Sequence, residues 1–154
     1  MKIYIFSSVN WDSFWQQPQE VAIALASQVD VIFVNPVAVR NKDFFHLNKL
    51  NNNRRHSHIK IIDSLTKVES FGLRYLIKQE RWFSSVVDGM KEDDIAIFYN
   101  PIGQTASYLK AKRRKVKIAF MFVDEYSILS ANKLRKIVVN FFTRQMIKKS
   151  SKVF

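Results

Sequence analysis

Two adjacent carboxylates, Asp124 and Glu125, are the side chains whose type and spacing most readily suggest chemistry. They come directly after an apolar run, and Tyr126 follows them. Neighbouring carboxylates can act as a general base, accept hydrogen bonds from sugar hydroxyls or hold a divalent cation. A turn aspartate before a glutamate at a helix start gives the same pattern, because negative charge is favourable at the positive end of the helix dipole. The residue types alone permit both interpretations.

A polar loop near the amino terminus carries three aromatic side chains, Trp11, Phe14 and Trp15, followed by Gln16 and Gln17. Aromatic residues are commonly buried, and burial would require no ligand. Two tryptophans beside two glutamines also resemble a surface that contacts a sugar or a lipid, because rings with an apolar body and a polar edge suit such ligands.

Three histidines, His46, His56 and His58, lie in or beside one basic loop. A metal site would need a further ligand, and Asp63 is the only candidate nearby in sequence. We therefore expect a solvated basic loop and no metal.

Glycine is scarce, and this limits the cofactors that the chain can bind. With three glycines, the sequence contains neither G-x-G-x-x-G nor the P-loop motif. We expect this domain to bind no cofactor, NAD and ATP included, by itself. The absence of cysteine excludes disulfides and thiolate chemistry.

The charge balance is unusual. Lys and Arg number 25 against 13 Asp and Glu, a formal net charge of +12. Such a balance favours an anionic partner, either nucleic acid, phospholipid or a phosphorylated substrate. The densest basic run, Lys110–Lys117, contains no aromatic residue, so we expect no nucleic acid binding there. A solvated patch or attraction to anionic lipid explains it better.

Apolar runs without sustained polar alternation recur along the chain and are typical of strands covered on both faces. They predict strands at Lys2–Phe6, Val29–Val34, Ile59–Ile62, Asp94–Tyr99 and Val116–Val123. Apolar residues at helical spacing predict intervening helices at Pro18–Gln28, Leu73–Met90, Gly103–Lys112 and Asn132–Lys149. This alternation predicts an α/β fold in one domain, residues 1–154: a Rossmann-like, doubly wound parallel sheet with helices on both faces. Residues 37–58 and 63–72 are expected to be loops.

Each predicted strand ends in polar residues, namely Ser7-Ser8, Asn35-Pro36, Asp63-Ser64, Asn100-Pro101 and Asp124-Glu125. In a parallel sheet these ends share one edge, where doubly wound domains bind ligands. Such residues are also good turn formers, so any single strand end needs no functional explanation. Together with the aromatic loop, the set favours a binding site.

No secretory signal is visible, because four apolar residues precede Ser7. No uncharged apolar stretch approaches the roughly 20 residues of a membrane span. We expect a soluble protein.

Several segments resemble the amino-terminal half of bacterial GT-B glycosyltransferases of the family-4-like group. NWDSFWQQPQEVAIALAS followed by VDVIFVNP is similar to that family's opening strand, W-D-x-x-W-Q-R-P-Q-type loop, helix and second strand. Gln17 replaces the arginine of the loop motif. DDIAIFYNP and IAFMFVDEYS are similar to two later segments, with Met121 at the first acidic position of the second. The closing KKSSKVF resembles the short strand that leads to the interdomain linker.

The resemblance implies the acceptor-binding domain of a two-domain enzyme. The carboxy-terminal domain, absent from this sequence, would bind most of the nucleotide-sugar donor. The enzyme would transfer a sugar to a cell-surface polysaccharide or lipid-linked acceptor, in the cytoplasm or at the inner membrane face. These 154 residues would be inactive alone.

The resemblance also implies roles for individual residues. Trp11, Trp15, Gln16, Asn100 and Tyr126 would form the acceptor site. Asp124 and Glu125 would contact the acceptor hydroxyl or the donor sugar, with either as the catalytic base.

The alternative is a non-enzymatic, flavodoxin-like binding module whose basic surface meets nucleic acid or another protein. A response-regulator receiver fits less well, because Ser7-Ser8 stands where that fold needs acidic residues.

Overall fold

The structure is a computed structural model. It describes residues 1–12, 16–39, 57–100 and 102–121, together with 140–141, 144, 147–148 and 152–153.

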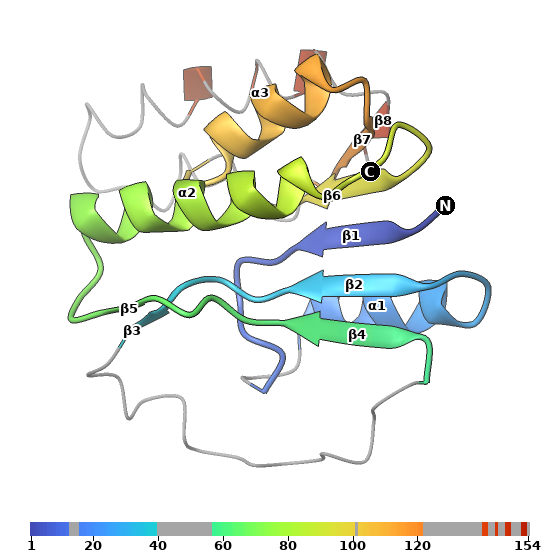
Figure 1. The fold of residues 1–154 in the computed structure, drawn as a ribbon, viewed down its shortest axis with the longest axis horizontal. Coiled ribbons are helices and arrows are strands. Elements are labelled where there is room, and N and C mark those ends of the chain that lie inside the picture. Colours follow the sequence, from blue (N-terminus) through green and yellow to red (C-terminus); the bar gives the residue numbers. More distant parts are fainter. Residues whose placement is uncertain are drawn as a thin grey trace.

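Within the described ranges, six strands form one parallel sheet. They are β1 (Ile3–Phe6), β2 (Val31–Val34), β4 (Ile59–Ile62), β6 (Ile95–Phe98), β7 (Lys117–Phe120) and β8 (Lys152–Val153). Their order across the sheet is β4-β2-β1-β6-β7-β8, and every neighbouring pair is parallel (Figure 1). The predicted doubly wound α/β fold is confirmed, and the five predicted strands are correct to within three residues at each end.

The helices that the structure describes in full are α1 (Gln17–Ala26), α2 (Leu73–Asp88) and α3 (Thr105–Arg113). All three lie where the sequence predicts them. Most of the predicted helix at 132–149 falls outside the described residues.

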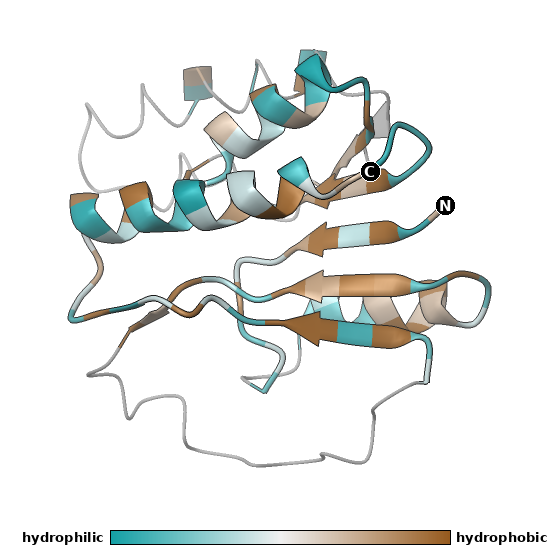
Figure 2. Cartoon of the chain, viewed as in Figure 1, coloured by the Kyte–Doolittle hydropathy of each residue, from teal (hydrophilic) through white to brown (hydrophobic). Residues whose placement is uncertain are grey.

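Alternate residues of a strand face opposite sides of the sheet, and this divides the core into two layers. Ile3 and Ile5 pack with Ala22 and Ala26 of α1 on one side. The other side holds one larger cluster, which joins α2 and α3 to the sheet through Tyr4, Phe6, Ile32, Val34, Phe83, Val87, Phe98 and Tyr108. Figure 2 shows the corresponding apolar strands. Helices therefore cover both faces.

Stacked and edge-on aromatic rings fix the α2 side of this core. The rings of Phe6 and Phe98 stack with centroids 4.6 Å apart, and Phe83 from α2 meets Phe6 edge-on at 5.3 Å. Such pairs add roughly 0.5–1.5 kcal/mol each beyond the area they bury.

The end of α3 has an unusual residue in its cap. The N–H of Val116 donates to the carbonyl of Ala111, and the N–H of Lys115 donates to that of Lys112, each at 3.1 Å. These bonds form a Schellman motif, which usually has glycine at the left-handed position. Here Lys115 holds that position with φ of 60°.

One expectation was wrong. A second, two-stranded parallel sheet, β3 (Ala38–Val39) with β5 (Lys67–Val68), lies within segments expected to be loops. Two-residue strands are too short to show any periodicity, so the sequence pattern could not reveal them.

Candidate functional site

Polar residues that follow four strands lie at the carboxyl edge of the main sheet. Ser7, Asn35, Asp63 and Asn100 each come one or two residues after β1, β2, β4 and β6. The in-register parallel pairing brings these strand ends to one edge, as predicted. Asp124, Glu125 and Tyr126 fall outside the described residues.

Asn35 is the centre of a hydrogen-bond network at this edge. Its side-chain Oδ1 accepts from the backbone N–H of Trp11 at 2.7 Å, and its Nδ2 donates to Oδ1 of Asp63 at 2.7 Å. Its backbone carbonyl accepts from the indole Nε1 of Trp82 at 2.9 Å. Asn35 is buried, whereas Asp63 is exposed. One amide side chain therefore connects the first loop to the end of β4.

Gln19 holds the aromatic loop against α1. Its Oε1 accepts from the backbone N–H of Gln16 at 3.2 Å, and its Nε2 donates to the carbonyl of Asn10 at 3.2 Å. The side chain is fully buried. Pro18, in the first turn of α1, needs no N–H partner there. Pro18 and Gln19 of the W-Q-x-P-Q-type motif therefore stabilise the start of the helix and the preceding loop. Gln16 of the same motif is exposed at the helix start.

Trp11 lies in the core of the molecule. Its side chain is 6% exposed, and its ring meets Phe33 edge-on with centroids 4.9 Å apart. In this conformation the ring offers almost no surface to a ligand. The predicted contact between Trp11 and an acceptor stays a prediction. Trp15, its partner in that prediction, is outside the described residues.

Gln104 joins the ends of β6 and β1. Its Oε1 accepts from the backbone N–H groups of Tyr99 and Asn100, each at 3.0 Å, and its Nε2 donates to the carbonyl of Phe6 at 2.8 Å. The side chain is fully buried. It satisfies three backbone groups at the point where neighbouring strands separate.

Asn100 forms a local turn after β6. Its Oδ1 accepts from the N–H of Ile102 at 2.8 Å, and the residue is half-buried. Gly103 follows with φ of 77°, a conformation that side chains rarely adopt. The predicted site residue Asn100 is thus at the carboxyl edge, with its oxygen already engaged.

Tyr99 carries a polar atom that the fold leaves unpaired. Its side chain is 1% exposed, and its hydroxyl is the one buried side-chain polar atom in the described part of the chain without a hydrogen-bond partner. Burial raises the pKa of this phenol strongly, because the charged form would lose its hydration.

Sequence reasoning missed the buried glutamines Gln19, Gln79 and Gln104. Gln79 Oε1 accepts from the N–H of Val37 at 2.8 Å and so ties α2 to the segment after β2. A signal was available for Gln79, because it stands four residues before Phe83 on the apolar stripe of α2. A polar residue on a buried stripe indicates a backbone partner.

Of the three loop histidines, the structure describes His58. His58 Nδ1 lies 3.0 Å from Oδ1 of Asp30, and both side chains are exposed. His46 and His56 are outside the described residues. No cluster of three or more possible ligands occurs among the residues that the structure describes.

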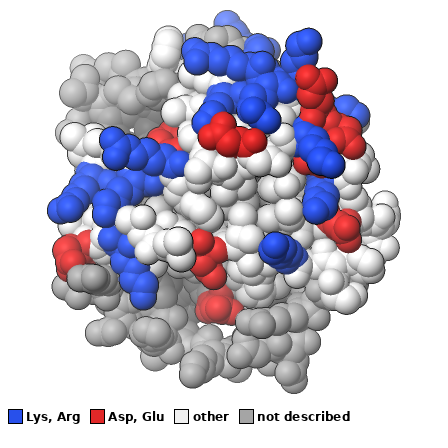
Figure 3. Space-filling model, in the orientation of Figure 1, with Lys and Arg blue, Asp and Glu red and all other residues white. Residues whose placement is uncertain are grey.

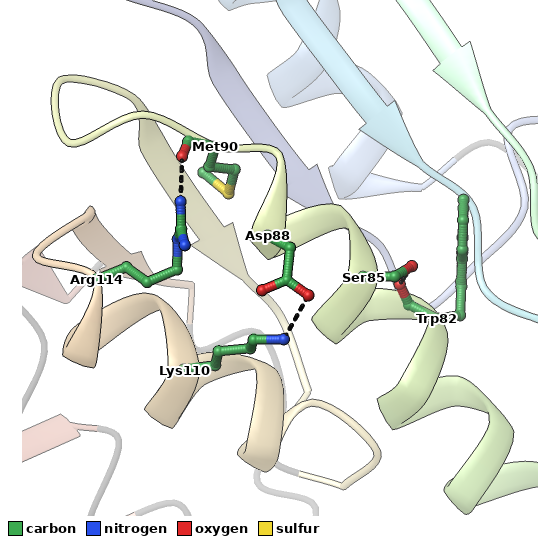
Figure 4. A network of polar contacts seen from close by, with 6 residues as sticks. All are labelled: Trp82, Ser85, Asp88, Met90, Lys110 and Arg114. Atoms are coloured by element: carbon green, nitrogen blue, oxygen red, sulfur yellow. Dashed lines mark hydrogen bonds and ion pairs between the residues drawn. The ribbon is translucent and has the colours of Figure 1, made fainter.

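The basic run Lys110–Lys117 lies at the amino edge of the sheet, since it spans the end of α3 and the start of β7. Lys110 Nζ is 2.6 Å from Oδ2 of Asp88, and Arg114 donates to the carbonyl of Met90 at 3.1 Å (Figure 4). These contacts join the end of α2 to α3, on the opposite edge from the Asn35 network.

Compared with known proteins, the chain matches no family model, and no curated protein matches it at a significant level. In the described ranges, every helix is too short or too polar to cross a membrane.

Proposed function

We propose that this chain is the acceptor-binding domain of a glycosyltransferase, which transfers a sugar from a nucleotide-sugar donor to a polysaccharide or lipid-linked acceptor. The carboxyl edge of the main sheet would bind the acceptor. Gln16, Asn100 and Tyr126 would contact it, and Asp124 or Glu125 would serve as the base. The donor phosphates would be bound by another domain.

One contact supports this proposal best. The backbone N–H of Trp11 donates to Oδ1 of Asn35 at 2.7 Å. Trp11 begins the W-D-x-x-W-Q-R-P-Q-type loop, whose W-Q-x-P-Q part is the more specific element of the resemblance, and Asn35 belongs to the V-N-P segment, which is supportive. Their direct contact at the ligand-binding edge of a parallel sheet is what a shared site would require.

Binding of acceptor-like and donor-like molecules by the 154-residue chain tests the proposal. Saturation-transfer NMR would be recorded with short alkyl glycosides and, separately, with nucleotide sugars. We expect signals from the glycosides alone, weakened by Gln16→Ala and Asn100→Ala. The exposed Gln28→Ala, two residues beyond the end of α1, serves as the control.

Two results would contradict the proposal. Transfer of sugar from a nucleotide donor by this chain alone would show that it is not half of an active site. Salt-dependent binding to RNA or DNA without any glycoside signal would favour a non-enzymatic binding module.

The catalytic assignment needs the donor-binding domain. In a protein that includes it, Asp124→Asn or Glu125→Gln should abolish transfer while glycoside binding changes little. A loss of binding equal to the loss of transfer would assign that carboxylate to binding.

A further inference from the structure

Exposed apolar side chains concentrate on the stretch that leads into α2. Leu65, between β4 and β5, is fully exposed, and Phe71, Leu73 and Ile77 are 52%, 74% and 45% exposed. Single exposed apolar residues are ordinary, but a group of them on one surface indicates an interaction site. We call these four residues, together with the basic residues Arg74, Lys78 and Arg81 of α2, the α2-start surface.

Basic side chains line the same side of α2. Arg74, Lys78 and Arg81 follow one another at helical spacing, directly beside Leu73 and Ile77. Figure 3 shows Lys and Arg gathered at the left, where α2 begins in Figure 1. Long basic side chains can extend past neighbouring apolar groups and keep their charged ends in a polar layer.

Glu80 is the acidic residue of α2 nearest to these basic residues, and its carboxylate contacts the start of α3. The Glu80 carboxylate accepts from the backbone N–H groups of Ala106 and Ser107, each at 3.2 Å, and from the Ser107 hydroxyl at 2.8 Å. These bonds hold the Glu80 carboxylate at the start of α3, so it forms no ion pair with Arg74, Lys78 or Arg81. The exposed Glu69 is the acidic residue that precedes Phe71 in the chain.

We propose that the α2-start surface docks on an anionic lipid bilayer. Leu65, Phe71, Leu73 and Ile77 enter the interfacial layer, and Arg74, Lys78 and Arg81 contact lipid phosphates. Exposed apolar side chains beside basic ones are the combination that binds anionic membrane surfaces. The Phe71 ring meets Tyr75 edge-on at 4.9 Å, which keeps it beside the helix start. This inference stands whether or not the chain binds a glycoside.

Sedimentation with vesicles tests the proposal. The intact chain would be mixed with vesicles of phosphatidylcholine alone, or of phosphatidylcholine and phosphatidylglycerol in equal parts, over a range of salt concentrations. We expect binding to the anionic vesicles only, weaker at high salt. Leu65→Ser with Leu73→Ser should reduce the affinity about tenfold or more, because exposed apolar groups no longer enter the interface.

A matched pair of charge variants separates this surface from the general effect of the +12 charge. Arg74→Gln with Lys78→Gln removes two positive charges at the start of α2, and Lys112→Gln with Arg113→Gln removes the same two types from the end of α3. We expect the first pair to weaken vesicle binding about 10–30-fold and the second pair to weaken it less than threefold. Leu109→Ser on α3 is the apolar control.

Three outcomes would overturn the proposal: no binding to anionic vesicles, equal losses for the two charge pairs, or unchanged binding after Leu65→Ser with Leu73→Ser. A concentration-dependent dimer that these serine substitutions dissociate would instead assign the surface to self-association. Far-UV circular dichroism would establish that each variant is folded.

Discussion

The two edges of the main sheet differ in most of their polar contacts. The exception is the buried Asp94 at the amino edge, whose carboxylate accepts from the backbone N–H groups of Lys2 and Lys91 at 2.7 and 3.0 Å. At the carboxyl edge, the buried amides of Asn35 and Gln104 bond to backbone groups of neighbouring segments at 2.7–3.0 Å. At the amino edge, exposed ion pairs join Lys110 to Asp88 and the terminal amine to Asp93, at 2.6 and 3.3 Å.

This difference has energetic consequences. A buried backbone N–H that loses its partner costs about 1–3 kcal/mol, because water cannot replace the lost bond. An exposed ion pair contributes about 0–1 kcal/mol and weakens with salt. The carboxyl edge should therefore be rigid, with its loops fixed by uncharged groups, while the amino edge should tolerate substitution at its exposed ion pairs, though not at the buried Asp94.

Gln104→Met should have the largest effect. It keeps the side-chain volume but leaves two N–H groups and a carbonyl without their partner, so we expect a loss of about 2–4 kcal/mol in unfolding free energy. The exposed Gln28→Met is the matched control, expected within about 0.5 kcal/mol. Urea denaturation measures both. Equal small effects would show that the carboxyl edge does not depend on this amide.

Asn35→Ala should cost about 1–3 kcal/mol, because the buried N–H of Trp11 loses its acceptor. Its partner Asp63 is exposed and can bond to water, so Asp63→Ala should cost less than about 0.5 kcal/mol. Thermal unfolding would compare the two. Similar losses for both would mean that the Asn35–Asp63 bond, and not the Trp11 contact, maintains the network.

Tyr99→Phe should stabilise the protein by about 1 kcal/mol, because it removes a buried hydroxyl that lacks a partner. A pH effect should accompany it. Burial raises the pKa of Tyr99 above the ordinary phenol pKa of about 10, so the unfolded chain ionises first and stability falls as pH rises above that value. The fall should be shallower in the variant. Burial also raises the pKa of Tyr75 to about 12. Tyr75 therefore lowers stability at high pH in the same way, and it does so in both the unsubstituted protein and the variant.

Lys115→Gly should stabilise the protein by about 0.5–1 kcal/mol, because glycine adopts the left-handed conformation at that position without strain. Lys115→Ala keeps the strain but removes the charge, and should change stability little. If alanine stabilised as much as glycine, charge repulsion within the basic run would be the cause.

Lys110→Met should have the smallest effect, at most about 0.5 kcal/mol, since its ion pair with Asp88 is well exposed. Unfolding at low and high salt would measure it. A loss above about 1.5 kcal/mol would remove the contrast between the two edges.

Much of the fold could be predicted from the sequence, because the strands are apolar on both faces and the helices have clear stripes. Ile3–Phe6 is an example, because all four residues are buried and the strand lies in the middle of the sheet. The β3–β5 pair could not be predicted, because its pairing depends on long-range contacts and not on any local pattern.

The candidate site was only partly predictable. Strand ends such as Asn35 and Asn100 follow from parallel pairing. The burial of individual side chains does not follow from strand pairing. The sequence therefore could not show that Trp11 packs on Phe33 or that the Gln104 side chain is buried. Those depend on three-dimensional packing against distant segments.

Chemical-shift mapping tests the central claim, that the carboxyl edge is the binding edge. Backbone amide shifts would be followed while a short alkyl glycoside is added to the intact chain. We expect the largest changes at Ser7, Gln16 and Asn100, whose N–H groups lie at that edge. Changes concentrated instead at the amino edge, around residues 91–94 and 112–117, would contradict the account.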